Sequence, residues 1–377
     1  ARDPAERGRS VADLDTRVVA YEDGMPVGGA GAFPLTMSVP GGGEVATAGL
    51  TCVAVLPTHR RRGVLDAMMR THLDEARARN QAIMALWTTE GPIYGRYGYG
   101  LASFAGDVSV ECDRAAFADP RPPAYRARFV GESEAAELFP PLWERVRRQT
   151  PGMPSRSPGW WRVRRLGDPD GGGAGGGPLQ RVLVEIDGRP EAYALYRIGH
   201  KWEEHVAAGT VTVTEAVGAS PAGTRAVWRY LLDIDLMRRV EAAYLPVDHP
   251  LFLLLADPRR LHYAAYDALW LRIVDVRAAL SARAYGAAGS IVLEIDDACP
   301  WNRGRFRLEG ATSRVAATDE APDLRLPVAA LGSAYLGGVS FTRLADAGAV
   351  EELAGGAIAR ADELFRAARA PWCPEAF

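Results

Sequence analysis

The sequence has few cysteines, no excess of basic residues and no recognisable metal motif. Its 377 residues include four cysteines that lie far apart and form no Cys-x-x-Cys pair, so their spacing predicts neither a zinc site nor a disulfide framework. The formal net charge is −3, whereas nucleic-acid binders usually carry a basic stripe. None of the six histidines stands in a His-Glu-x-x-His motif. We therefore expect no metal and no nucleic-acid partner.

Long apolar runs are also missing. No stretch reaches the roughly 18 to 20 apolar residues that span a bilayer, and no signal-peptide pattern is present. A reduced cytoplasmic location is expected, and secretion by a non-standard route stays compatible with the sequence. The composition is 48% hydrophobic and 24% charged, which is typical of globular proteins, and the length predicts two or three domains.

The stretch from Val53 to Gly100 carries the clearest chemistry. It is predicted to form a strand, a basic turn, a helix, a second strand and a tyrosine-rich loop. Pro57 ends the first strand because proline has no N–H to donate, and Gly63 lets the backbone approach an anion closely. From Val64 the apolar residues recur with helical spacing. A helix start beside arginines binds phosphate well, although most arginine-rich turns are only solvated surface.

These residues resemble a known acetyl-CoA motif. The turn Val53–Leu65 is similar to the Arg-x-x-Gly-x-Gly/Ala motif of the GNAT N-acetyltransferases; Arg60 and Gly63 match it, while Leu65 replaces the usual small residue. The run Ile83–Trp87 resembles the strand that diverges from its neighbour to admit pantetheine. Together with the loop that follows, the pattern resembles the enhanced intracellular survival (Eis) family of three-domain bacterial acetyltransferases.

The resemblance implies the roles of individual residues. The backbone of Val53, Ala54 and Val55 would pair with pantetheine, and Thr89 with Glu90 would contact the cofactor near the thioester. Tyr94 would be the general acid, with Tyr97 and Tyr99 as competing tyrosines. The pyrophosphate would be held by the turn and the first helical residues, namely Arg60, Arg61, Arg62, Gly63, Val64, Leu65 and Asp66.

The family resemblance also assigns a role to the last residue. The free carboxylate of a C-terminal Phe serves the family as general base, and this chain ends in Phe377. A free α-carboxyl has a pKa of about 3.5, and burial of the tail would raise it toward a useful range. Glu375 and Glu90 are the alternative bases. His59 is more simply a solvated or hydrogen-bonded residue than a catalytic one.

A second region repeats the first. Arg181–Pro190 matches Arg17–Pro26 as a hairpin with an Asp-Gly turn, and Thr210–Val217 stands where the strand through Val55 stands. Aligning Val217 with Val55 places Arg225 at the position of Gly63 and predicts a helix from Arg225 to Leu236. This copy would therefore be degenerate and would not bind CoA. A helix is expected at Ser133–Gln149, and Gly167–Pro178 is expected to form a flexible surface loop.

The remaining chain predicts a third domain. Strands are expected from Ser290 and from Arg305, a helix follows near the end, and the layout resembles a sterol-carrier-type domain. It could hold lipid, but a scaffold for the tail and for subunit contacts is the simpler role. We predict an α/β (α+β) fold of tandem GNAT domains plus this domain, with boundaries at 1–113, 114–273 and 274–377. Val108–Cys112 is expected to close the first sheet, and a native N-terminal segment is expected to be missing before Ala1.

The predicted function is acetyl-CoA-dependent N-acetylation of a primary amine, of the aminoglycoside, polyamine or lysine type. The amine would attack the thioester directly, without a covalent acyl-enzyme, because no Cys-His or Ser-His-Asp set is visible. The resemblance implies a homohexamer. The alternative is a vestigial assembly that binds lipid or protein through its third domain.

Overall fold

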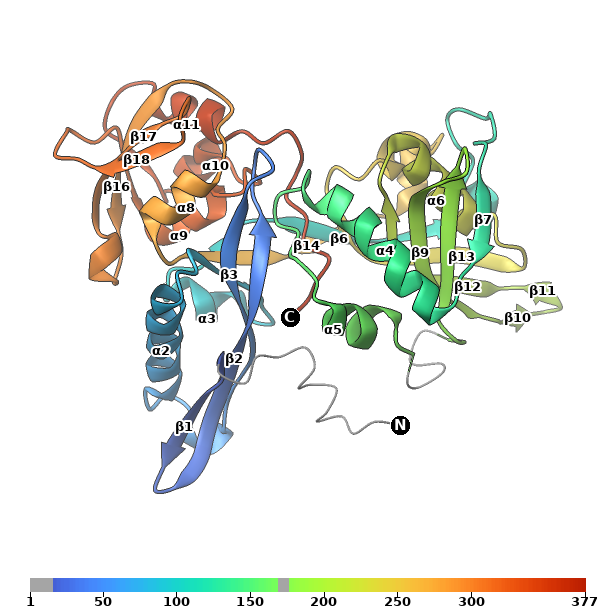
Figure 1. Cartoon of the computed structure of the whole chain (residues 1–377), viewed down its shortest axis with the longest axis horizontal. Coiled ribbons are helices and arrows are strands. Elements are labelled where there is room, and N and C mark those ends of the chain that lie inside the picture. Colours follow the sequence, from blue (N-terminus) through green and yellow to red (C-terminus); the bar gives the residue numbers. More distant parts are fainter. Residues whose placement is uncertain (1–15, 169–175) are drawn as a thin grey trace. The chain divides into compact units, whose positions relative to one another are not determined.

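The computed structural model describes residues 16–168 and 176–377, which fall into two compact units (Figure 1). One unit holds residues 16–104, 148–155 and 267–377. The other holds the described parts of 105–147 and 156–266. Residues 1–15, at the expected N-terminal truncation, and most of the loop expected at Gly167–Pro178 lie outside the described residues.

The first unit contains a six-stranded sheet in the order β1-β2-β3-β4-β15-β5. The predicted hairpin is confirmed, since Asp23 and Gly24 both have positive φ angles, of 50° and 80°, as a tight hairpin turn requires. A turn at Pro40–Gly43 separates the second and third strands. The strands are β1 (Val18–Glu22), β2 (Met25–Ser38), β3 (Glu44–Val55), β4 (Ile83–Trp87), β5 (Gly100–Leu101) and β15 (Leu269–Ile273).

Helix α2 (Val64–Ala78) begins where the periodicity predicts. Gly63 is its N-cap residue in the left-handed region, and the predicted apolar face is buried except for Leu65, which is half-buried. His72 also lies on the buried face, where desolvation lowers its pKa. Short elements precede and follow the helix: the 3-10 turn Pro57–His59 and helix α3 (Gly91–Gly95).

The prediction that Val108–Cys112 closes the first sheet is wrong. That segment is the end of β6 (Phe104–Glu111), which pairs antiparallel with β13 in the sheet of the other unit. The first sheet instead receives β15, which pairs with both β4 and β5. Alternating apolar residues show that a strand has one buried face, but not which sheet edge it joins. No single cut in the chain separates the two sheets, so the boundaries at 113 and 273 stay a proposal.

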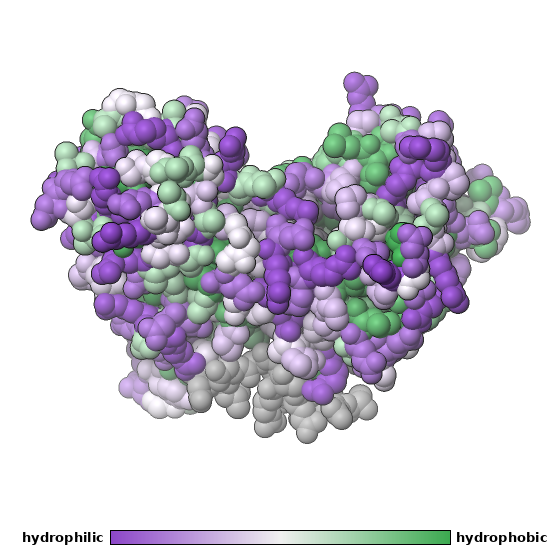
Figure 2. Space-filling view, turned by 45° about the horizontal axis from the view of Figure 1, so that its top comes forward, coloured by the Kyte–Doolittle hydropathy of each residue, from purple (hydrophilic) through white to green (hydrophobic). Residues whose placement is uncertain are grey.

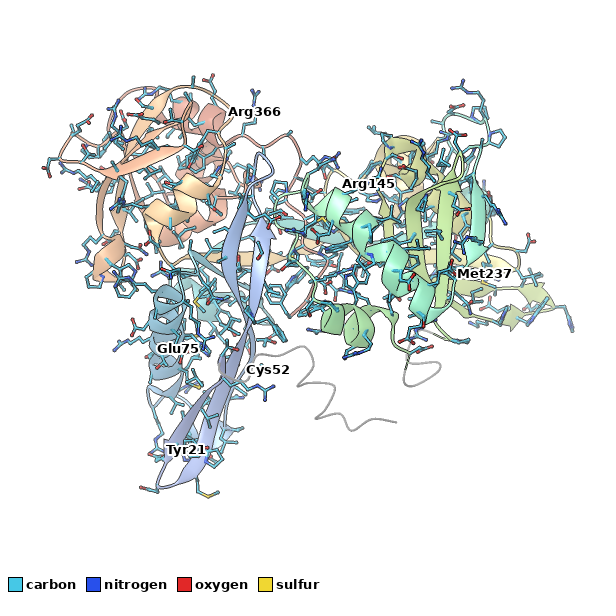
Figure 3. All side chains as sticks on the ribbon, viewed as in Figure 1. Tyr21, Cys52, Glu75, Arg145, Met237 and Arg366 are labelled. Carbon is cyan, nitrogen blue, oxygen red and sulfur yellow. The ribbon has the colours of Figure 1, made fainter. Side chains whose placement is uncertain are left out.

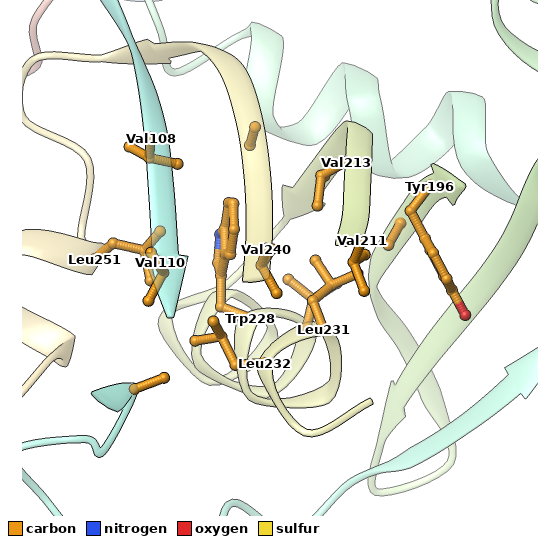
Figure 4. Close-up of a cluster of buried hydrophobic side chains, with 14 of the residues drawn as sticks. Val108, Val110, Tyr196, Val211, Val213, Trp228, Leu231, Leu232, Val240 and Leu251 are labelled. Atoms are coloured by element: carbon orange, nitrogen blue, oxygen red, sulfur yellow. The ribbon is translucent and has the colours of Figure 1, made fainter. Parts of the chain in front are cut away.

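The second unit contains a seven-stranded sheet in the order β14-β6-β13-β12-β9-β8-β7. Its core packs Trp228, Leu231 and Leu232 of α6 against valines of β6, β12 and β13 (Figure 4). The predicted helix Ser133–Gln149 is confirmed as α4 (Glu132–Arg147). The other bounds are β7 (Arg126–Phe129), β8 (Gln180–Ile186), β9 (Arg189–Gly199), β10 (Trp202–Glu203), β11 (Val206–Ala207), β12 (Gly209–Gly218), β13 (Met237–Pro246), β14 (Ala264–Asp267), α5 (Pro158–Trp160), α6 (Pro221–Leu232) and α7 (Leu251–Leu254).

The internal repeat is visible in this unit. Asp187 and Gly188 form the same positive-φ turn as Asp23 and Gly24, and β12 precedes α6 as β3 precedes α2. The predicted bounds of the second helix are wrong, because it begins at Pro221 rather than at Arg225. Only Ala219 and Ser220 separate β12 from α6, so the second copy has no long turn that could align with the first.

The third region forms a five-stranded sheet in the order β18-β17-β16-β19-β20. The expected strands are confirmed as β16 (Ser290–Asp296) and β17 (Gly304–Glu309). Its remaining elements are β18 (Arg314–Ala317), β19 (Leu324–Pro327), β20 (Glu351–Glu352), α8 (Val276–Ala282), α9 (Val328–Ala334), α10 (Phe341–Asp346) and α11 (Ala357–Phe365).

Hydrophilic residues cover much of the face seen in Figure 2, and hydrophobic residues lie there in small groups. Among the described residues, no helix combines the length and the apolar character needed to cross a membrane.

Candidate active site

Strands β3 and β4 diverge, as the family resemblance implies. They pair in parallel only from Thr47 to Gly49 on β3 and from Ile83 to Ala85 on β4. Beyond Gly49, β3 continues to Val55 along β2, while β4 continues to Trp87 along β15. The edge of β3 that faces β4 is therefore unpaired from Leu50 onward among the described strands. Such an edge can accept an extended ligand as an added strand.

A bulge in β3 marks the start of the open edge. The register against β2 shifts between Gly29 and Gly31, and Cys52 on β3 has a φ of 52° (Figure 3). A bulge re-aims the backbone groups that follow it. Ala54 and Val55 then pair with Gly29 and Gly28 of β2 on the opposite edge. Their outward backbone groups are the ones that the resemblance assigns to pantetheine.

The basic turn between β3 and α2 is open at its glycine. Gly63 has a φ of 82°, and a Cβ placed there would have no described atom within 4 Å. Its N-cap position has no side-chain hydrogen bond, so the first N–H groups of α2 face outward. Arg60 and Arg61 are exposed and form no ion pair with any described residue. The turn thus combines a helix start, a close-approach residue and free cations.

Glu22 of β1 holds Arg62 and His59 of the turn. Its carboxylate accepts a hydrogen bond from Arg62 and lies 3.0 Å from Nε2 of His59. Nδ1 of His59 lies 2.8 Å from the Thr58 hydroxyl. His59 is therefore a hydrogen-bonded residue, as the simpler interpretation expected.

Asp66, in the first turn of α2, is bound by Tyr97. The Tyr97 hydroxyl donates to the Asp66 carboxylate, and burial together with this bond raises the pKa of Tyr97 to about 12. The side chain of Asp66 is therefore engaged, and only its backbone N–H could serve an anion. Tyr97 is correspondingly less suited to act as an acid than a tyrosine with an available hydroxyl.

Tyr94, in contrast, has an available hydroxyl. Its hydroxyl has no hydrogen-bond partner among the described residues, and its half-buried ring packs edge-on against Tyr99 at 5.8 Å between ring centroids. Burial, and then the negative charge of Glu90, raise the pKa of Tyr94. Tyr99 is fully buried and donates only to the Met84 sulfur at 3.8 Å. Glu90 is exposed and its N–H donates to the Thr88 hydroxyl, while Thr89 is also exposed.

The chain terminus lies at the point where β3 and β4 diverge. Phe377 is 9% exposed, and a Cβ at Gly49 would lie 3.2 Å from its ring atoms Cδ2 and Cε2. The tail is fixed upstream by a hydrogen bond from the Trp372 N–H to the Pro151 carbonyl, of 2.8 Å. Glu375, the alternative base, is 1% exposed.

The second copy lacks the features of the first. Ser220 caps α6 by accepting a hydrogen bond from the Gly223 N–H, and Arg225 donates to the backbone carbonyls of Asp119 and Arg121. A Cβ at Gly223 would lie 2.4 Å from the Glu191 carbonyl oxygen. The start of α6 is thus capped and covered by protein.

Sequence reasoning missed several residues that shape this site. Glu22 carried no signal beyond its place before a hairpin turn. Arg272, which packs under the loop after β4, could not be found because its strand was assigned to the central domain. Among the described residues, no group of three or more His, Cys, Asp or Glu side chains could hold a metal ion.

The family models define the class of protein. An acetyltransferase (GNAT) domain matches residues 1–102, a second acetyltransferase (GNAT) domain matches 152–282, and a sterol carrier protein domain matches 276–374. The molecule is therefore a tandem GNAT protein with a C-terminal sterol carrier protein domain. GNAT domains use acetyl-CoA as the acetyl donor.

Relatives along the whole chain define the family. An uncharacterised N-acetyltransferase of Streptomyces avermitilis is 39% identical over all of this chain and 93% of the relative. The N-acetyltransferase Eis of Mycobacterium tuberculosis is 33% identical over 90% of this chain and 84% of the relative. The crystal structure of Eis1 from Mycobacterium abscessus matches with a TM-score of 0.86 and 33% identity, over 98% of this chain and 92% of that one. The chain belongs to the Eis family of GNAT N-acetyltransferases.

Proposed function

We propose that the enzyme transfers acetyl from acetyl-CoA to a primary amine by direct attack within the N-terminal GNAT domain. The observation that carries this proposal is the divergence of β3 and β4. The same unit also contains an open basic turn, an available tyrosine hydroxyl and the chain terminus. An extended thioester bound along β3 would need all three of these features. All come from one compact unit.

The cofactor is proposed to bind along β3. Pantetheine pairs with the unpaired backbone edge of Val53, Ala54 and Val55. The pyrophosphate lies on the turn, where Arg60, Arg61 and Arg62 add formal charge to the N–H groups that follow Gly63. Val64, Leu65 and Asp66 contribute through the backbone, because the Asp66 side chain is bound by Tyr97. Thr89 and Glu90 lie on the loop beyond β4, near the thioester end.

The proton transfers are proposed to involve Phe377 and Tyr94. A typical primary amine, with a pKa of about 10.4, is mostly protonated at pH 7 and must lose a proton before it attacks. The Phe377 carboxylate would accept that proton. The tetrahedral intermediate then expels the CoA thiolate, to which Tyr94 would donate. Its raised pKa keeps the phenol protonated at neutral pH.

The acceptor is proposed to be an amine of the aminoglycoside, polyamine or lysine type. Acetyl-CoA turnover against a panel of these amines tests the function directly. Turnover of none of them by the wild-type protein would refute the proposal. We also propose a cytoplasmic homohexamer, for which light scattering that gives a monomer at micromolar concentration would be the contrary result.

Tyr94→Phe tests the acid. We expect kcat to fall about 10²- to 10⁴-fold, the usual contribution of a positioned acid, with acetyl-CoA affinity retained. Tyr97→Phe is the matched control because it removes a neighbouring hydroxyl that is bound to Asp66. Retained kcat in Tyr94→Phe with a large loss in Tyr97→Phe would reverse the assignment.

A glycine appended after Phe377 tests the base. It moves the carboxylate by one residue and leaves the Phe377 ring free to keep its place against Gly49. We expect kcat/KM to fall at neutral pH and to recover partly at high pH, where the free amine is more abundant. Unchanged kcat/KM would remove the C-terminal carboxylate and direct attention to Glu375 or Glu90.

A further inference from the structure

The loop that carries Tyr94 is held at two glycines by residues from outside the sequence motif. Gly98 has a φ of 82°, and a Cβ there would lie 2.8 Å from Cγ1 of Val328 and 2.9 Å from Nε of Arg272. A Cβ at Gly100 would lie 1.9 Å from the Ala329 carbonyl oxygen. Both positions need glycine because the backbone approaches its neighbours closely.

Arg272 is an almost fully buried cation on β15 with a fixed guanidinium. One terminal nitrogen donates to the Ile273 carbonyl at 2.7 Å, and the other donates to the Asp297 carboxylate, also at 2.7 Å. Asp297 in turn accepts from the Cys299 N–H and from the Asn302 amide. The sterol carrier protein domain therefore holds one terminal nitrogen of the guanidinium through Asp297, and the backbone of β15 holds the other.

The remaining edge of Arg272 faces the loop. Its Nε is buried and has no hydrogen-bond partner among the described residues, and it lies under Gly98. An unpaired buried N–H of this kind lowers the stability of the folded state. A buried ion pair can often be replaced by apolar residues at no cost in stability. Stability alone is therefore a poor reason for this arrangement.

Helix α9 fixes the same loop from the sterol carrier protein domain. Its residues are mostly small, and a Cβ at Gly332 would lie only 2.5 Å from the Leu271 carbonyl oxygen of β15. Ser333 also faces Gly100, where a Cβ would lie 2.5 Å from its hydroxyl. The helix and β15 thus pack closely against the second half of the loop.

The constraint reaches Tyr94 through the loop backbone. The Tyr94 carbonyl accepts hydrogen bonds from the N–H groups of Tyr97 and Tyr99, at 3.0 and 3.3 Å. The Tyr94 ring packs on Tyr99, which stands between the two clamped glycines. A shift of Gly98 would therefore move Tyr99 and, with it, the Tyr94 ring.

We propose that Arg272, held by Asp297, is a positioning residue for Tyr94, and that the sterol carrier protein domain serves catalysis by fixing the acid loop. This inference rests on the proposed role of Tyr94. Arg272 does not touch the reacting atoms. It determines where the phenol lies relative to the leaving thiolate, and a misplacement of about 1 Å can cost 10²-fold in rate.

The experiment compares three variants by steady-state kinetics, acetyl-CoA binding and thermal unfolding. Arg272→Met with Asp297→Leu removes the buried pair without leaving a lone charge. Arg272→Lys keeps the positive charge opposite Asp297 but loses the planar group under Gly98. This variant is used if the double variant does not fold. Asp323→Asn is the control, since it removes a carboxylate that binds the Val292 N–H and Arg360, both of which lie in the same domain and neither in the loop.

We expect kcat to fall at least tenfold in the Arg272 variants, with the acetyl-CoA Kd changed less than twofold. Asp323→Asn should lower the melting temperature and leave kcat unchanged. In a Tyr94→Phe background, Arg272→Lys should have no further effect on kcat, because it acts through that hydroxyl. Unchanged kcat in the folded Arg272 variants, or additive losses in the Tyr94→Phe background, would overturn the inference. Retained kcat in Tyr94→Phe alone would instead refute the proposed acid.

Discussion

Gly63 and Gly188 offer a matched pair of substitutions. Both are glycines at a positive φ, of 82° and 73°, and a Cβ at either position would have no described atom within 4 Å. Gly63 lies at the start of α2 in the basic turn, whereas Gly188 lies in the hairpin turn of the second copy. Replacing each by valine therefore imposes similar backbone strain and fills similarly open space. Only Gly63 faces the proposed pyrophosphate.

The expected magnitudes separate strain from binding. A non-glycine residue in the left-handed region costs about 1–3 kcal/mol, so both variants should lower the melting temperature by similar amounts. At Gly63 the side chain would also obstruct the N–H groups that follow it. A hydrogen bond to a charged group contributes about 1.5–3 kcal/mol, so the loss of two such bonds should weaken acetyl-CoA binding at least about a hundredfold.

Calorimetric titration of acetyl-CoA into the two variants measures the difference. Gly188→Val should bind as the wild type does, and Gly63→Val should show little or no binding at the same concentrations. Wild-type affinity in both variants would refute the assignment of the turn as the pyrophosphate site. Equal losses would show that backbone strain, and not obstruction of a ligand, is responsible.

Two further predictions concern the number of acetyl-CoA sites and the pH dependence of stability at Tyr97. Calorimetry should give one acetyl-CoA per chain, since α6 is capped by Ser220 and covered at Gly223; two per chain would contradict the inert second copy. Tyr97 has a pKa raised to about 12 in the folded state, so it keeps its proton over the pH range in which the unfolded chain releases it. Its stabilisation is full below about pH 10 and is lost as the pH rises toward 12. The melting temperature of Tyr97→Phe should therefore fall less steeply over that range than that of the wild type, and equal slopes would contradict the raised pKa of Tyr97.

Local signals predicted the elements around the site well. The Asp23-Gly24 turn, the end of β3 before Pro57 and the start of α2 at Val64 each follow from the chemistry of neighbouring residues. The exchange of β6 and β15 between the two sheets could not be predicted in this way. Both strands alternate or cluster apolar residues as any half-buried strand does, and nothing in that pattern specifies the partner strand.

The second helix shows where alignment by motif fails. Matching Val217 to Val55 assumes that the second copy has the same long turn between strand and helix as the first. In the structure, only Ala219 and Ser220 connect β12 to α6. Ser220 followed by Pro221 is a helix start that local rules would have found, because Ser is a favoured N-cap and Pro a favoured first residue. The repeat was correct, but its register beyond the strand was not.

No local sequence rule indicates that a chain end more than 300 residues away lies beside Gly49. A position for Phe377 there could therefore be expected only from the family resemblance. The structure supplies the physical means. The sterol carrier protein domain fixes the Tyr94 loop at Gly98 and Gly100, and it ends in the tail that the Trp372 N–H anchors to Pro151. The domain that packs against the loop of the proposed acid thus also carries the proposed base at its end, and it contributes no residue to the cofactor turn. A domain of this kind would be kept for the geometry it imposes, whether or not it binds a lipid.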